Sequence, residues 1–384
     1  MLGRDRVYKA LEHKTADRLP LAFDGTYEVI ERIVKYLGID KEIPLNLSST
    51  STYSTKVGPR EFGIDHEIAL RRKLGVDVVI LGCPTSKEKT IGNWYGFSLI
   101  RRLEDNTIEG AWGIRFKEFE YPFGKYIEMC DPPLSKTVDL QFIISYPLPD
   151  LDLYDYSSLS GILPKYDGFF IFLMMNGIHD ISRFIRGTEE FYLDLIISPR
   201  TAEALLDKLL EFNLEYLKRC VGKTKGKIDA VFCGDDYGSQ RGMLISPKMW
   251  RTFIKPRLKE LISTVHQYGL KYCHHSCGGI RPIISDLIEI GVEILNPIQP
   301  RAAGMDPFEL GKEFGKDIVF FGGIDEQETL PKGSVEDVRK EVRQRIKTLG
   351  SYNGYIVAPS HDFQPDTSVE NILAIYNEIL NKEF

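Results

Sequence analysis

The chain has 384 residues, more than the ~250–300 at which a single hydrophobic core usually stops growing. Hydrophobic residues make up 43% and charged residues 27%, a balance typical of globular proteins and not of disordered ones. The formal net charge of −6 provides no basic surface, so we expect neither nucleic acid nor anionic lipid as a partner.

Membrane insertion, export and a disulfide scaffold are not expected either. The longest apolar run, residues 169–176, is far shorter than the ~20 residues of a membrane-spanning helix. The N-terminal segment is charged and amphipathic instead of apolar, and six cysteines are sparse for a chain of this length. We therefore expect a cytoplasmic protein.

Short apolar runs alternate with longer amphipathic segments along the chain. Eight of these runs resemble buried strands, at 18–23, 76–81, 168–176, 229–236, 270–277, 293–299, 318–325 and 354–361. Several are continuously apolar, as parallel strands covered on both faces are. Helical patterns lie between them, for example from Ser246, a cap followed by Pro247, to a stop at Gly269. This alternation predicts an α/β fold of the (β/α)₈ TIM barrel type. A doubly wound sheet is the competing topology, but the sequence lacks the glycine-rich dinucleotide-binding motif that would support it.

One stretch departs from the alternation. Residues 93–149 carry aromatic residues, glycines and an Asn-Thr break at short spacing, and then a proline-rich connector. This pattern predicts a small β-meander inserted between the second and third barrel strands. We expect residues 1–384 to form a single barrel domain with this β-rich subdomain as an insertion.

Polar or reactive residues follow four of the last five predicted strands, where barrel active sites form. The strongest signal is His275-Ser276-Cys277, because residues two apart on a strand project to the same face. Imidazole and thiolate at this spacing can bind one Zn²⁺. The same pattern also fits a buried, unreactive cysteine, so both interpretations remain open at this stage.

The predicted catalytic residues are His361, Asp235 and Asp236. His361 follows the last predicted strand and is a candidate third zinc ligand, proton donor or substrate contact. Asp235 and Asp236 are adjacent on a strand, so one should enter the pocket while the other braces the loop. The predicted metal ligands are His275, Cys277 and His361.

Further polar residues at strand ends are predicted to bind the substrate, namely Asp24, Tyr237, Gln299 and Asp325. The other histidines, His13, His66, His179 and His266, lie in helical or loop patterns and are expected to be exposed.

Several motifs in order resemble the uroporphyrinogen decarboxylase superfamily: GRDRVYKALEHKTADRLP, GDDYGSQRGMLISPKMWRTFIKPRLKELI, HHSCGGIRPIISDLIEIGVEILNPIQP, FGGIDEQETLP and APSHDFQPDTSVENI. The superfamily groups the decarboxylase of haem synthesis with zinc-dependent methyltransferases that act with corrinoid proteins. The resemblance spans nearly the whole chain and implies a (β/α)₈ barrel.

Two differences bear on the subfamily. The decarboxylases carry an arginine-containing motif after the first strand, but here no arginine lies between Arg18 and Arg32. Carboxylate-rich substrates are bound best by such arginines. The His275 and Cys277 pair resembles the methyltransferase zinc motif, while Ser360 or His361 stands where those enzymes carry a further cysteine.

The sequence therefore predicts a corrinoid-dependent methyltransferase. It would use Zn and move a methyl group between a corrinoid (methylcobalamin) protein and a small O- or N-methyl compound or thiol. The alternatives are a uroporphyrinogen decarboxylase and a non-catalytic tetrapyrrole- or corrinoid-binding barrel. A homodimer is left open.

Overall fold

The computed structural model describes residues 1–42, 63–86, 89–94, 97–122, 124–136 and 139–382. Within these residues, no helix combines the length and apolar character needed to cross a bilayer.

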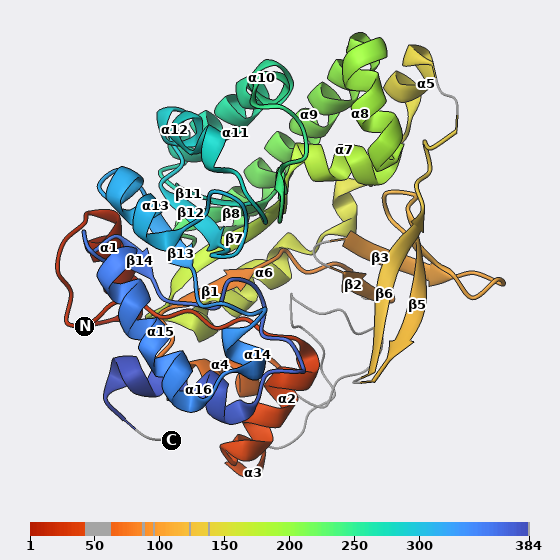
Figure 1. Ribbon diagram of the computed structural model, residues 1–384. Helices are drawn as coiled ribbons and strands as arrows, with labels where there is room; N and C mark the ends of the chain where they lie inside the picture. Colours follow the sequence, from red (N-terminus) through yellow and green to blue (C-terminus); the bar gives the residue numbers. More distant parts are fainter. Residues whose placement is uncertain (43–62, 87–88, 95–96, 123, 137–138, 383–384) are drawn as a thin grey trace.

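The central element is a curled sheet of seven parallel strands (Figure 1). Its spatial order is β1 (Val78–Leu81), β7 (Phe170–Asn176), β8 (Ala230–Gly234), β11 (Lys271–His275), β12 (Ile294–Ile298), β13 (Val319–Gly322) and β14 (Tyr355–Ile356). All seven correspond to predicted strands, and helices separate most of them in the chain. The α/β class is therefore as expected.

The first predicted strand, at 18–23, appears only as a bridge. Leu21 pairs in parallel with Val357 beyond β14, and the Leu21 carbonyl accepts a hydrogen bond from the Asp77 amide before β1. Pro20 has no N–H to donate to a ladder, which limits regular pairing here. Closure into an eight-stranded barrel stays a prediction.

A second sheet lies between β1 and β7 in the chain. It consists of five antiparallel strands: β2 (Gly92–Trp94), β3 (Phe97–Arg102), β4 (Ile108–Gly110), β5 (Arg115–Tyr121) and β6 (Gly124–Asp131). Figure 1 shows it beside the central sheet. The strands end at Asp131, and α5 (Leu140–Ser145) follows, so the regular β-structure is shorter than the predicted 93–149.

The helices lie mainly around the outside of the central sheet (Figure 1). They are α1 (Gly3–Leu11), α2 (Tyr27–Tyr36), α3 (Ile39–Glu42), α4 (Ile64–Lys73), α6 (Tyr156–Ile162), α7 (Ile178–Arg186), α8 (Thr188–Ile197), α9 (Pro199–Thr224), α10 (Pro247–Met249), α11 (Lys255–Gln267), α12 (Arg281–Glu289), α13 (Pro307–Phe314), α14 (Thr329–Lys332), α15 (Val335–Thr348) and α16 (Val369–Leu380). Short elements are the helical turns η1 (Leu151–Leu153), η2 (Leu163–Tyr166) and η3 (Trp250–Ile254), and a hairpin of β9 (Gly238–Ser239) and β10 (Gly242–Met243).

The helix predicted from Ser246 is interrupted by one wider turn. Ser246 Oγ accepts the Met249 amide as a cap, and Gly269 ends the segment with φ of 75°, both as expected. Between α10 and α11 the chain forms a π-turn, η3. Pro256 follows directly, and its ring would clash with the Thr252 carbonyl in a regular α-helix.

The inner face of the curled sheet holds its own hydrophobic core. Alternate residues of the strands meet there, among them Phe172, Phe232, Cys273 and Phe321, and α1 packs against them through Val7. Because side chains alternate, the residues two positions further along each strand point to the same interior. This alternation determines which side chains at the strand ends point into the interior of the curled sheet.

Candidate active site

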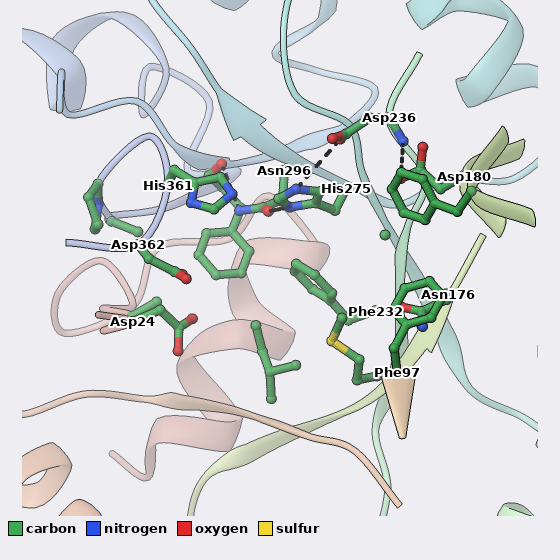
Figure 2. A pocket seen from close by; sticks show the side chains of 18 residues that line it. Asp24, Phe97, Asn176, Asp180, Phe232, Asp236, His275, Asn296, His361 and Asp362 are labelled. Atoms are coloured by element: carbon green, nitrogen blue, oxygen red, sulfur yellow. Dashed lines mark hydrogen bonds and ion pairs between the residues drawn. The ribbon is translucent and has the colours of Figure 1, made fainter. Parts of the chain in front are cut away.

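Polar side chains replace the apolar ones at the carboxyl ends of the strands. His275 follows Cys273 on β11, Asn296 follows Ile294 on β12, and Asn176 follows Met174 on β7. These polar residues line a cavity of about 300 Å³ (Figure 2).

The cavity is lined by residues from both sheets and the loops. They are Ala22, Asp24, Ile80, Phe97, Met174, Asn176, Asp180, Phe184, Phe232, Gly234, Asp236, His275, Asn296, Phe321, Ala358, Pro359, His361 and Asp362. A volume of this size matches the lower end of small-molecule sites.

Three donor groups meet beside this cavity, two of which, His275 and His361, line it. The ligand atoms of His275, Cys277 and His361 all lie within 4.8 Å of one another, and each residue is half-buried. The distance from His275 Nε2 to Cys277 Sγ is 3.6 Å, and the imidazole centroids of His275 and His361 are 5.7 Å apart. The predicted metal ligands are thus brought together, although His361 is far from the other two in the sequence.

This arrangement suits a zinc ion. With Zn–N and Zn–S bonds of ~2.0–2.3 Å, tetrahedral ligand atoms lie about 3.3–3.8 Å apart. The His275–Cys277 separation falls in this range. Three protein ligands would leave a fourth position, as in catalytic zinc sites.

Asn296 fixes the orientation of the His275 ring. Its Oδ1 lies 2.6 Å from His275 Nδ1, so the ring donates from Nδ1 and directs Nε2 toward Cys277. Asn296 itself is 7% exposed and is held on β12. Metal-binding histidines commonly carry such a partner on their second nitrogen.

Asp236 lies beside the three donors. Its Oδ1 accepts the Cys277 backbone N–H at 2.7 Å and lies 3.8 Å from His275 Nε2. The Asp236 amide in turn donates to Asp180 Oδ2 at 3.0 Å. Asp236 therefore holds the loop that carries Cys277 and also faces the cavity.

The Cys277 thiol and the two imidazoles favour one another's charged forms, while the imidazoles oppose each other's protonation. Burial opposes ionisation of the Cys277 thiol, but His275 and His361 outweigh it and hold the pKa of Cys277 below its ordinary value. Burial likewise lowers the pKa of His275, but Cys277 and Asp236 raise it to about 9. A thiolate here is an available metal ligand.

The loop after β14 places His361. Its backbone is held at both ends, by a parallel bridge of Pro359 to Ile324 and another of Phe363 to Gly25. The Ser360 amide also donates to the Ile324 carbonyl at 2.8 Å. Asp24 and Asp362 lie next to His361 on the same side of the cavity (Figure 2).

Asp24 is the one predicted substrate-binding residue that lines the cavity. Its Oδ1 lies 3.5 Å from the Arg71 guanidinium. Burial raises the pKa of Asp24 to about 7, with Arg71 opposing the shift and Asp362 adding to it.

Asp235 lies outside the cavity lining and caps a helix. It is 1% exposed, and its Oδ1 accepts the Asp180 amide at 2.8 Å near the start of α7. Its Oδ2 accepts the Tyr237 hydroxyl at 2.7 Å, and burial raises the pKa of Asp235 to about 7. Gly177 leaves room for this carboxylate, since a Cβ there would lie 2.0 Å from Asp235 Cγ. The geometry therefore gives Asp235 and Tyr237 structural contacts.

The other two predicted substrate-binding residues also lie away from the cavity lining. Gln299 Oε1 accepts the Gly278 amide and the Gln240 side-chain amide, which supports the loop after Cys277. Asp325 pairs with Arg301 at 2.5 Å.

Two histidines expected at the surface are buried, so that expectation was wrong. His66 is 2% exposed and His179 is 0% exposed. His179 lies on the inner side of α7, where its ring stacks on Tyr192 at 5.8 Å. The rings of Phe191 and Tyr237 also lie against it, so aromatic side chains and not solvent surround this imidazole.

Asn296, Asp180, Asp362 and the phenylalanine side chains of the cavity were not predicted. The single polar residue within the apolar segment 294–298 was a usable signal for Asn296. Phe97 comes from β3 of the antiparallel sheet, so only the tertiary structure brings it to the cavity.

These features define a class: an α/β protein with a binding cavity at the carboxyl ends of parallel strands. The family model described as "Uroporphyrinogen decarboxylase (URO-D)" matches residues 181–381, more than half of the chain. The chain therefore belongs to the uroporphyrinogen decarboxylase family.

Individual relatives carry two different names. The chain is 27% identical over 173 residues to "Methylcobamide:CoM methyltransferase MtaA" of Methanosarcina barkeri, covering 45% of this chain and 47% of that protein. It is 24% identical over 172 residues to a uroporphyrinogen decarboxylase of Thermus thermophilus, covering 44% of this chain and 45% of that protein. The match thus spans slightly under half the length of each curated relative.

A solved structure shares the fold over its whole length. It is described as a methyltransferase from Methanosarcina mazei, with a TM-score of 0.69, 20% identity and coverage of 99% of both chains.

Proposed function

We propose that this protein is a zinc-dependent methyltransferase that transfers a methyl group from a corrinoid carried by a partner protein to a small thiol. The grouping of the His275, Cys277 and His361 donor atoms carries this proposal, together with the position of His275 and His361 in the wall of the cavity. The names of the Methanosarcina barkeri relative and of the Methanosarcina mazei structure support the methyltransferase class.

When bound, zinc would hold the thiol sulfur and lower its pKa, so that a thiolate forms at neutral pH. The side chains of His275, Cys277 and His361 would hold the ion, with Asn296 orienting His275. Asp236 would accept the proton released by the thiol, because its carboxylate lines the cavity beside His275.

The methyl transfer would form one bond and break one. The thiolate sulfur forms a bond to the methyl carbon, and the carbon–cobalt bond breaks with both electrons left on cobalt. The products are a methyl thioether and a Co(I) corrinoid. The phenylalanine side chains of the cavity would exclude water from the reacting carbon.

A uroporphyrinogen decarboxylase is the second candidate, because the Thermus relatives carry that name. The lining residues that the structure describes include no arginine or lysine, the groups that best bind a carboxylate-rich substrate. We therefore expect no decarboxylation of uroporphyrinogen III.

An anaerobic assay separates these functions. The zinc-loaded protein is incubated with methylcobalamin and 2-mercaptoethanol, and the methyl thioether and the Co(I) absorbance are measured. We expect zinc-dependent product that Cys277→Ala abolishes and Cys273→Ala retains, since Cys273 lies in the core below the cavity. A protein that binds no zinc and transfers no methyl group would contradict the proposal. In a second assay, an O- or N-methyl compound replaces methylcobalamin and 2-mercaptoethanol and is offered with a Co(I) corrinoid. Methyl transfer in this second assay only would mean that the protein demethylates such compounds and does not methylate a thiol.

We further propose that Leu21 belongs to an eighth strand that closes the barrel, supported by its contacts to both edge strands. The whole chain would then be one domain with the antiparallel sheet as an insertion.

A further inference from the structure

The two imidazoles of the donor group are held differently. Asn296 holds the second nitrogen of the His275 ring, as is common for metal-binding histidines. For His361, no comparable partner of the second ring nitrogen is found among the described residues, although Cys277 lies beside the ring. In the described part of the chain, one nitrogen of His361 is therefore open to an acceptor.

Glu326 carries a buried oxygen atom that lacks a partner. Its Oε2 is shielded from solvent and makes no hydrogen bond among the described residues. A buried polar atom without a partner costs free energy, so each one in a native protein requires an explanation. The Glu326 amide donates to Ser360 Oγ at 3.3 Å, which ties this residue to the loop that carries His361.

The backbone register brings the Glu326 and His361 side chains to the same side. Ile324 and Pro359 form a parallel bridge, and each chain reaches the residue in question two positions further on. Residues two apart in extended chain point to the same face. Asp325, which precedes Glu326, turns its carboxylate to the opposite side, where it forms an ion pair. The Glu326 side chain therefore points toward the cavity side, next to His361.

The charges of the two groups act on each other. Burial raises the pKa of Glu326 to about 7, and His361 is the group that opposes this rise most strongly. The other imidazole, that of His275, has a smaller effect. Of the two histidines, His361 is thus the one that interacts with Glu326.

We propose that Glu326 is the positioning residue of His361. When zinc is bound by one ring nitrogen of His361, Glu326 Oε2 accepts the N–H of the other nitrogen. This inference rests on the proposed function, which supplies the zinc ion. Carboxylates are common partners of metal-binding histidines, because they fix the tautomer and the ring orientation and raise the basicity of the ligand. Glu326 would thus have the same role for His361 as Asn296 has for His275.

Two substitutions at Glu326 separate the acceptor from the charge. Glu326→Leu removes the acceptor and should weaken zinc binding about 10- to 100-fold in competition with a chromophoric chelator. Glu326→Gln keeps an oxygen acceptor and should bind zinc within a few-fold of the wild type. The matched control is Glu328→Leu, which removes a 47% exposed carboxylate two residues further on and should leave the affinity unchanged. Melting temperatures of the metal-free proteins verify folding.

Nuclear magnetic resonance of protein labelled with ¹⁵N-histidine observes the hydrogen bond itself. In the zinc-loaded wild type, we expect a slowly exchanging imidazole N–H that is missing from His361→Gln and is lost in Glu326→Leu. A role of Glu326 in folding alone would not alter this signal. If Glu326→Leu does not fold, the wild-type spectrum still decides, since a freely exchanging His361 N–H would overturn the proposal.

The outcomes distinguish this inference from the proposed function. A wild-type protein that binds no zinc contradicts the proposed function and the positioning role with it. Wild-type affinity in a folded Glu326→Leu protein overturns the positioning role alone, while the zinc site stands. An equal loss of affinity in Glu326→Leu and Glu326→Gln would mean that the charge and not the acceptor is needed, which also overturns the proposed hydrogen bond.

Discussion

Replacing Asn296 by leucine should weaken zinc binding about 10- to 100-fold, the usual effect of losing a second-sphere hydrogen bond to a metal-binding histidine. The affected contact is the 2.6 Å hydrogen bond to His275 Nδ1, which fixes the tautomer with Nε2 free to bind the metal. The expected loss corresponds to ~1.4–2.7 kcal/mol of binding free energy. Leucine has the same branched shape and removes both polar atoms, including the donor of the long 3.4 Å hydrogen bond to the Phe321 carbonyl on β13.

Competition with a chromophoric zinc chelator measures this affinity directly. The matched variant is Asn296→Asp, which keeps an oxygen acceptor in the same place and should bind zinc within a few-fold of the wild type. The melting temperatures of the metal-free variants verify that the fold is kept. Wild-type affinity in a folded Asn296→Leu protein would refute the orienting role that we assign to Asn296.

Three further outcomes are expected. Cys277→Ala should reduce the zinc content to background, while Cys273→Ala, in the core on β11, should keep about one zinc per chain by elemental analysis. A full zinc content in Cys277→Ala would exclude Cys277 as a ligand. Gly177→Ala should lower the free energy of unfolding by ~1–3 kcal/mol in urea titrations, because its Cβ would overlap the carboxylate that caps α7, whereas Gly222→Ala on α9 meets open space and should raise it by ~0.5–1 kcal/mol. Asp24→Asn should change the pH dependence of the melting temperature. The pKa of the Asp24 carboxyl is raised to about 7 in the folded protein, against ~3.9 in the unfolded chain. Its contribution to stability is therefore fully present below pH ~3.9 and is lost as the pH rises through 7. The wild type should therefore lose stability relative to the variant between about pH 4 and 7, and a constant difference would contradict this assignment.

The sequence predicted the part of the site that depends on local periodicity. His275 and Cys277 are two residues apart, and the residue between them, Ser276, is fully buried. The strand alternation that makes Cys273 a core residue also makes His275 a cavity residue. The prediction that His275 and Cys277 lie on one face therefore required only the position of the strand β11 in the sequence.

The remaining contacts depend on tertiary structure. Asp235 and Asp236 are chemically identical neighbours, and only the position of α7 makes the first a helix cap and the second a cavity residue. His179 likewise lies in a helical pattern, but the side that packs inward is decided by the neighbouring Tyr237 and Tyr192. A single sequence contains no direct record of such distances.

For the fold as well, the sequence predicted the elements that depend on local hydrophobicity and missed those that depend on tertiary structure. The seven strands of the central sheet follow the continuous apolar runs, which hydrophobicity predicts well. The first run, 18–23, forms one isolated bridge, from Leu21 to Val357, because its proline removes a ladder donor. The inserted β-rich subdomain was predicted to end in a proline-rich connector, and the structure forms the short helix α5 within that connector.

X-ray absorption spectroscopy at the zinc edge, with and without a thiol, tests the central claim most directly. We predict one sulfur and two imidazole nitrogens from Cys277, His275 and His361, and a rise from one sulfur to two when 2-mercaptoethanol is added. A spectrum with no sulfur ligand, or a sulfur number that the thiol leaves unchanged, would contradict the claim that these three residues form a thiol-activating zinc site.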